Sequence, residues 1–129
     1  IRSDHDDARI GDMPAFLTDG MLEKEQINDV TEYVLSLSEV RKDTAAVERG
    51  KQVYTENCAS CHGENAKGNR EFGAPDLTDA IWFYGKDKDI ILRTVSRGRG
   101  NVMPAWVDRL DDVTIRQMAL YVHSLGGGE

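Results

Sequence analysis

Both cysteines of the 129-residue chain lie in one pentapeptide, Cys58-Ala59-Ser60-Cys61-His62. The two-residue gap lets both sulfurs span one edge of a flat macrocycle, while the adjacent imidazole points at its centre. Two thiols at this spacing with a histidine directly after them are the attachment pattern of a c-type haem. The motif therefore predicts one covalent haem c, with Cys58 and Cys61 as attachment residues and His62 as the proximal iron ligand.

The motif has three other possible interpretations. A thioredoxin-like dithiol needs βαβ surroundings and gains nothing from the histidine. A zinc site would need His5 or His123 to complete its ligands, and neither has the paired spacing of zinc modules. An ordinary disulfide is the third alternative. Haem attachment is favoured because the sequence holds no cysteine outside the motif.

A methionine downstream of the motif offers a second axial ligand. Met103 lies in the glycine-rich stretch 98–106 and precedes Pro104, which favours an extended loop. Thioether sulfur is a soft ligand, and a His/Met pair is one axial set of cytochromes c. The alternative role of a lone methionine is core packing, which we assign instead to Met118, on the apolar face of a helix. Met103 is the predicted sixth ligand.

The composition of the chain limits the classes of protein to which it can belong. The chain is 40% hydrophobic and 30% charged, with a formal net charge of -7, which is typical of a soluble globular protein. No apolar run is long enough to cross a bilayer. An acidic chain is a poor nucleic-acid binder, because phosphate contacts need a basic surface. The negative electrostatic potential of such a chain would attract a redox partner with a basic surface.

One element occurs twice. Met13-Pro14-Ala15-Phe16 matches Met103-Pro104-Ala105-Trp106 ninety residues later, and the apolar pattern after each copy also matches, including Tyr33 with Tyr121. This period has the length of a domain. We therefore expect residues 1–38 to be the C-terminal remnant of a first domain, 39–44 a linker, and 45–129 a complete single-haem domain. A longer parent with a second haem site ahead of Ile1 is the simplest explanation.

The helices expected from the sequence follow the apolar spacing and the capping signals. A helix after Glu23, with Gln26 in the capping-box position, ends near Ser38, and its repeat follows an N-cap at Asp111 and ends at the glycines 126–128. Further helices are expected over 45–57, 78–83 and 87–96, the first after a cap at Asp43 or Thr44. No strand pattern is present. Gly50 predicts a close helix crossing, with Tyr121 as the expected partner.

With these features together, the chain resembles class I cytochromes c, an all-α fold around haem. More narrowly, it is similar to the dihaem cytochrome c subunit (subunit III) of cbb-type haem–copper oxidases. The resemblance covers nearly the whole chain and is carried by residues 9–16, 29–38, 58–63, 73–82, 102–106 and 121–128.

The resemblance implies an electron relay toward a membrane cytochrome c oxidase, not an enzyme with catalytic residues of its own. It implies other oxidase subunits and a redox protein as partners, and a membrane-anchored parent on the periplasmic side of the bacterial inner membrane. The Pro75 carbonyl would accept a hydrogen bond from the His62 ring, and Trp82 would line the haem pocket or belong to the core. Candidates to meet the haem propionates are Arg93, Arg97 and Arg99.

Two expectations remain open at this level. The apolar helix within residues 21–38 lacks its own domain and must pack on the haem domain beside it or on a second copy, which would make a dimer. Met13 matches a ligand position whose haem is not attached to this chain. The competing function is a haem enzyme or gas sensor with an open sixth position, and a third is a disulfide or zinc module without haem.

Overall fold

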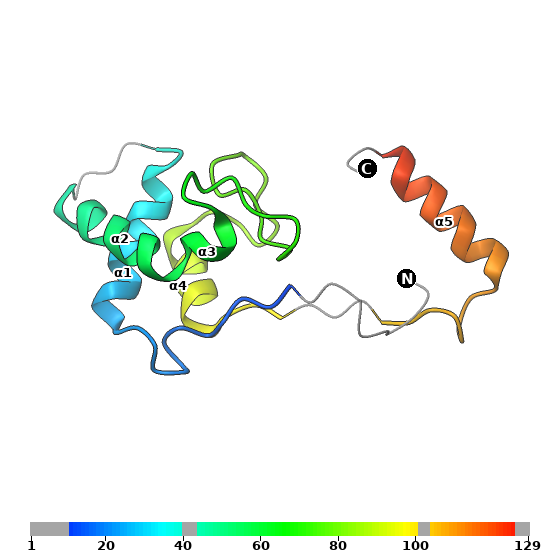
Figure 1. Ribbon diagram of the computed structural model, residues 1–129, viewed down its shortest axis with the longest axis horizontal. Coiled ribbons are helices and arrows are strands. Elements are labelled where there is room, and N and C mark those ends of the chain that lie inside the picture. The colour runs from blue at the N-terminus through cyan, green and yellow to red at the C-terminus, as the bar shows by residue number, and fades with distance from the viewer. Residues whose placement is uncertain (1–10, 40–43, 101–103, 126–129) are drawn as a thin grey trace. The chain divides into compact units, whose positions relative to one another are not determined.

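The computed structural model of the protein describes residues 11–39, 44–100 and 104–125. Its contacts divide the chain into two units, Arg9–Asn101 and Ile1–Ala8 with Val102–Glu129, which are described separately. The described residues form five helices: α1 (Lys24–Ser36), α2 (Thr44–Asn57), α3 (Ala59–His62), α4 (Lys88–Arg97) and α5 (Asp112–Ser124) (Figure 1). The described ranges contain only two isolated β-bridges and no strand. The predicted all-α class is confirmed.

Helix α1 begins as its capping signal predicts. The Glu23 backbone N–H donates to Gln26 Oε1 at 2.9 Å, and Glu23 and Gln26 form a reciprocal capping box. Its apolar face is buried at Ile27, Val30 and Val34. The helix ends at Ser36, slightly before the expected Ser38. The spacing of these apolar residues makes one face of α1 part of the core.

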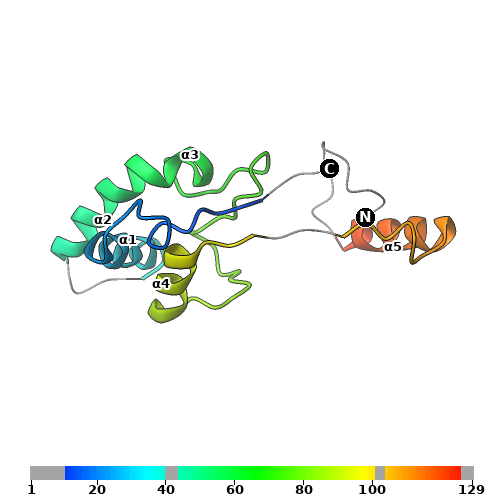
Figure 2. The ribbon, with the colours of Figure 1, turned by 90° about the horizontal axis from the view of Figure 1, so that it is seen from below.

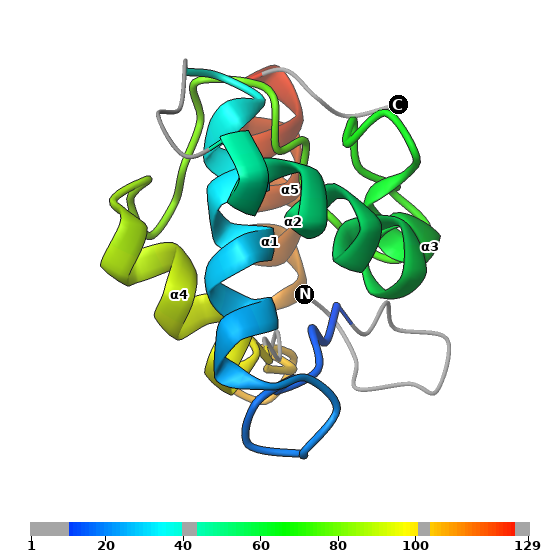
Figure 3. The same cartoon turned by 90° about the vertical axis from the view of Figure 1, so that its left-hand side faces the viewer.

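The core of the larger unit forms where α1 packs on α2 and α4. Figures 1 and 2 show α2 crossing α1, and Figure 3 shows α1 with α2 across it and α4 beside it. Tyr54 on α2 is 1% exposed, and its ring centroid lies 5.1 Å from that of Tyr33 on α1. Of the two places expected for the helix within 21–38, the structure therefore shows packing within the chain. The dimer stays a prediction.

Gly50 is the point of closest approach between α1 and α2. A Cβ at Gly50 would collide with the carbonyl oxygen of Asp29 and would lie 2.9 Å from Tyr33 Cβ. The predicted close crossing is therefore present with Tyr33 at the contact, while a contact of Gly50 with Tyr121, which lies in the other unit, stays a prediction. Tyr33 is the residue of the first copy of the repeat that matches Tyr121, and its helix takes the crossing.

The compact unit extends across the expected boundary at residues 39–44, because α1 joins the unit that holds α2 to α4. The predicted division into 1–38 and 45–129 describes the repeats in the sequence and stays a prediction about the parent protein. Within the larger unit, α1 and the Cys58-x-x-Cys61-His62 motif contact one core. The cluster includes Phe16, Leu22, Val30, Val53 and Ile91.

A partly buried ion pair links α1 to α2. Asp29, whose side chain is 4% exposed, accepts two hydrogen bonds from Arg49, at 2.6 Å from Nε and 2.9 Å from Nη2. We expect Asp29→Asn to lower the free energy of unfolding by about 2 kcal/mol, a value reduced for the exposure of Arg49. Chemical denaturation of the haem-loaded protein measures it, with Glu48→Gln on exposed α2 surface as the control. Equal stability of the two variants would contradict the assignment.

The segment after the motif is mostly irregular. Helix α4 matches the helix expected over 87–96, whereas the short helix expected over 78–83 is wrong. The Asp76 carboxylate accepts from the backbone N–H of Thr78 at 2.7 Å, and Asp79 Oδ1 accepts from that of Ile81 at 2.8 Å. Aspartate side chains that bond the backbone two residues later favour turns over helices. These turns replace the expected helix.

Helix α5 begins at the predicted cap. Asp111 Oδ1 accepts a hydrogen bond from the Thr114 backbone N–H at 2.9 Å. Ile115 is buried, whereas Tyr121, Val122 and Leu125 are exposed within the described residues. The glycines 126–128 and the Asp43 cap of α2 lie outside the described residues.

Candidate haem site

The two cysteines lie one helical turn apart, at the point where α2 leads into α3. The backbone N–H of Cys58 donates to the Tyr54 carbonyl at 2.8 Å, and that of His62 donates to the Cys58 carbonyl at 2.9 Å. Residues three apart on a helix lie on one face. Both thiols are free and half-buried. This arrangement presents two sulfurs side by side on a short, hydrogen-bonded turn.

A backbone carbonyl, that of Pro75, orients the imidazole of His62. His62 Nδ1 lies 3.1 Å from the carbonyl oxygen of Pro75, and the carbonyl can only accept, so Nδ1–H is the donor. This tautomer leaves Nε2 with a free lone pair, the form that binds a metal. Burial lowers the pKa of His62 and outweighs the opposing effect of the Pro75 bond. The ring is therefore neutral and oriented, as an iron ligand requires.

The loop that carries Pro75 is fixed against the motif. The Gly68 backbone N–H donates to the His62 carbonyl at 2.8 Å, and Asn69 and Ala74 bond each other in an antiparallel bridge. Gly68 has φ +80°, and a Cβ there would lie 2.7 Å from the Pro75 carbonyl carbon. Tyr54 adds a hydrogen bond of 2.7 Å from its hydroxyl to the Gly63 carbonyl. These contacts set the position of the Pro75 acceptor.

The environment of Cys58 bears on the rival interpretations of the motif. Burial, helped by the neighbouring Cys61, raises the pKa of Cys58 to about 11. A thiol that stays protonated forms disulfides slowly, because the thiolate is the reactive species. In the residues the structure describes, no group of three or more His, Cys, Asp or Glu side chains is arranged to hold a metal ion. The raised pKa of Cys58 disfavours a reactive dithiol.

The surroundings of the motif fit a large apolar group. In the described part of the larger unit, the exposed large apolar side chains are mostly on the loop after the motif, at Phe72, Ile81, Phe83 and Tyr84. Apolar surface gathered in this way marks a ligand or partner site. Trp82 is half-buried against the core, with Nε1 donating to the Asp79 carbonyl at 3.1 Å. Its two expected roles, pocket wall and core, are therefore compatible.

The candidate propionate arginines differ in their surroundings. Arg93 and Arg97 on α4 are exposed. Arg99 is half-buried, stacks its guanidinium 3.9 Å from the Tyr84 ring centroid, and donates to Thr94 Oγ1 from Nη2 at 2.8 Å. Two neighbours thus already fix the position of the Arg99 side chain.

Of the methionines in the two Met-Pro loops, the structure describes Met13 but not Met103. Met103, the predicted sixth ligand, lies outside the described residues. Met13 is half-buried in the larger unit, where it packs against the core cluster that Cys58 and Trp82 also contact. Met13 matches a ligand position of the first repeat, and the haem that it would serve stays a prediction.

An all-helical unit in which a Cys-x-x-Cys-His turn presents two free thiols beside an oriented histidine is the arrangement of a c-type cytochrome. Residues 45–122 match the family described as cytochrome c oxidase, cbb3-type, subunit III. The chain belongs to this family, as the sequence resemblance predicted, and the family carries haem c.

Curated relatives agree with this assignment. The chain is 53% identical to the cbb3-type cytochrome c oxidase subunit CcoP of Azospirillum brasilense, in an alignment that covers 100% of this chain and 46% of the relative. It is 51% identical to subunit FixP of Bradyrhizobium sp. (strain ORS 278), with 100% and 45% covered. It is 50% identical to subunit CcoP of Rhodobacter capsulatus, with 98% and 45% covered. The chain thus spans less than half the length of these relatives. Among the described helices, none has the length and apolar character needed to cross a bilayer.

Proposed function

We propose that this chain carries one covalently attached haem c and relays single electrons toward the oxygen-reducing centre of a membrane cytochrome c oxidase. The observation that carries the proposal is the contact between His62 Nδ1 and the Pro75 carbonyl, because it leaves Nε2 available beside two free thiols. The names of the relatives, all subunits of cbb3-type oxidases, supply the direction of the relay.

Each residue of the site has a role that follows from its chemistry. Cys58 and Cys61 hold the macrocycle through thioethers, and His62 binds iron while Pro75 fixes its ring plane. Trp82 and the apolar loop after the motif keep water from one face. A methionine thioether closes the sixth position, and Met103 is the residue predicted from the sequence for that role. When bound, the haem supplies a one-electron change at iron. A histidine and a methionine that both bound the iron would leave it no open position for a substrate.

The partners follow from charge and from the relatives. A net charge of -7 suits a donor with a basic surface. Other oxidase subunits are the expected permanent partners, and the periplasmic side of a bacterial inner membrane is the expected location, with a membrane-anchored parent. This placement makes the chain an electron entry point of the oxidase.

The sixth position distinguishes an electron carrier from a haem enzyme or gas sensor. In the haem-loaded protein, we expect a sulfur-to-iron charge-transfer band at the red end of the ferric spectrum and no rapid carbon monoxide binding by the ferrous form. Stopped-flow mixing with carbon monoxide measures the second. Fast, saturating binding with no such band would instead support an open site and overturn the carrier function.

A further inference from the structure

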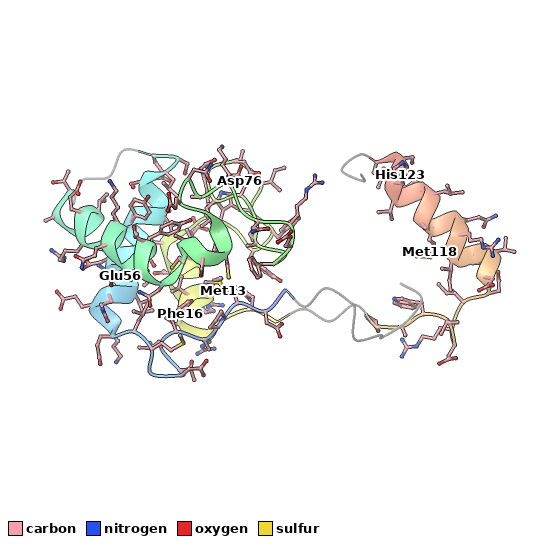
Figure 4. The ribbon with its side chains drawn as sticks, in the orientation of Figure 1. Met13, Phe16, Glu56, Asp76, Met118 and His123 are labelled. Atoms are coloured by element: carbon pink, nitrogen blue, oxygen red, sulfur yellow. The ribbon has the colours of Figure 1, made fainter. Side chains whose placement is uncertain are left out.

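We propose that Asp76 is a positioning residue for the iron ligand His62. Its carboxylate fixes the turn that follows Pro75 and so keeps the Pro75 carbonyl bonded to the His62 ring. The proposal rests on the haem-binding function above and adds a residue to that site. The contacts that support it lie in the segment between α3 and α4, residues 63–87. Figure 4 shows Asp76 on this segment.

The Asp76 carboxylate closes the turn that directly follows Pro75. Its Oδ1 accepts two hydrogen bonds from Thr78, one from the backbone N–H and one from the hydroxyl, both at 2.7 Å. Aspartate favours turns of this kind, and hydrogen bonds to an ionised acceptor are stronger than neutral ones. The hydroxyl and the N–H of Thr78 lower the pKa of Asp76, with a smaller contribution from Lys67. The carboxylate is therefore ionised at neutral pH and holds both donors.

A backbone hydrogen bond and an ion pair attach this turn to the segment that leaves α3. The Leu77 backbone N–H donates to the Ala66 carbonyl at 2.8 Å. On the next residue along the chain, Lys67 Nζ lies 3.5 Å from Asp76 Oδ2. The Lys67 side chain is 59% exposed, so this ion pair contributes little by itself. The backbone bond is thus the main link, and the turn at Asp76 presents the N–H that makes it.

Ala66 is held in a strained conformation by these contacts. It is fully buried and has φ +58°, and its N–H donates to the Gly63 carbonyl at 3.0 Å. A left-handed backbone costs free energy in a residue with a Cβ and persists only where its surroundings hold it. The Leu77 bond is one of the contacts that hold it, so the loop depends on an ordered turn at Asp76.

The peptide group between Pro75 and Asp76 carries this order to the ring. The Pro75 carbonyl oxygen lies 3.1 Å from His62 Nδ1. Because a peptide group is planar, this carbonyl and the Asp76 Cα lie in one plane, and a movement of Asp76 turns the acceptor. A Cβ at Gly68 would lie 2.7 Å from the Pro75 carbonyl carbon and 2.8 Å from the Asp76 nitrogen, so the group is closely packed. A well-placed acceptor orients a ligating imidazole and raises its basicity.

The test measures how fast the His62 Nδ1 proton exchanges with solvent, by NMR of the full haem-loaded chain in its ferrous form. We expect Asp76→Ala to exchange this proton at least about tenfold faster than the wild type, because the turn loses two hydrogen bonds to a charged group. Asp79→Ala is the matched control and leaves the rate unchanged. Asp79 Oδ1 accepts from the Ile81 backbone N–H at 2.8 Å, so the control removes the same charge from a similar turn that is not attached to the His62 acceptor.

An Asp76→Ala protein that exchanges the His62 proton as slowly as the wild type overturns the proposal, and so does an equal acceleration in Asp79→Ala. The amide protons of α2 are followed in the same samples, and an equal acceleration there would mean general destabilisation and would also overturn it. If Asp76→Ala does not fold, Thr78→Val, which removes one donor and keeps the charge, decides: faster exchange supports the proposal and an unchanged rate overturns it. A wild-type protein without covalent haem, or one whose His62 does not bind the iron, would refute the proposed function instead.

Discussion

Replacing Cys58 and Cys61 together by serine abolishes haem attachment and with it the stable fold of the larger unit. The physical reason is the placement of the motif: Cys58 contacts the core cluster, and the loop after the motif leaves Phe72, Ile81 and Phe83 exposed. Without the macrocycle this loop has little to pack on. A small domain buries too little apolar surface to tolerate that loss.

The measurement is thermal unfolding followed by circular dichroism, together with the visible spectrum of the denatured protein. We expect the double variant to be colourless after denaturation and to melt without a cooperative transition. Ser60→Ala, an exposed position between the cysteines, is the matched control and keeps both colour and cooperativity. A colourless double variant that melts like the wild type would show that the core does not depend on haem.

The second large effect is expected at Gly50. Helix propensity alone would make Gly50→Ala about 1 kcal/mol more stable. The new Cβ, however, meets the backbone of Asp29 and Tyr33 Cβ, and backbone does not move aside as a flexible side chain does. Overpacking of this kind costs about 3 kcal/mol. We therefore expect a net loss of about 2 kcal/mol for alanine and a larger loss for Gly50→Leu.

Denaturant unfolding of the haem-loaded variants tests this expectation. Lys51→Ala is the control, since Lys51 is the exposed neighbour on the same helix and should change stability by less than about 0.5 kcal/mol. A Gly50→Ala variant more stable than the wild type would mean that α1 does not cross α2 at this point.

Local signals in the sequence predicted most of the elements. The capping box at Glu23 and the cap at Asp111 gave the starts of α1 and α5, because each depends on residues within one turn. The helix expected over 78–83 failed because Asp76 and Asp79 bond the backbone locally, a competition that apolar spacing does not reveal. In this segment, the hydrogen-bonding preference of aspartate in turns predicts the structure better than the spacing of apolar residues does.

The Cys-x-x-Cys-His motif predicted which residues form the site. The spacing of apolar residues predicted less well which residues surround it. Cys58, Cys61 and His62 are adjacent in sequence, so their proximity needed no tertiary information. The contact between His62 and Pro75 was implied only by resemblance, and the structure contains it at 3.1 Å. The sequence did not predict Tyr33 at Gly50, because two copies of one helix carry the same contact residues and the sequence alone does not decide which copy packs there.

The intact mass of the chain under denaturing conditions tests the central claim most directly. Denaturation releases a haem held only by His62 and a thioether sulfur, and it leaves one held through Cys58 and Cys61. The account predicts a mass equal to the polypeptide plus one haem. A mass equal to the polypeptide alone, from cells able to attach haem to proteins, would contradict it.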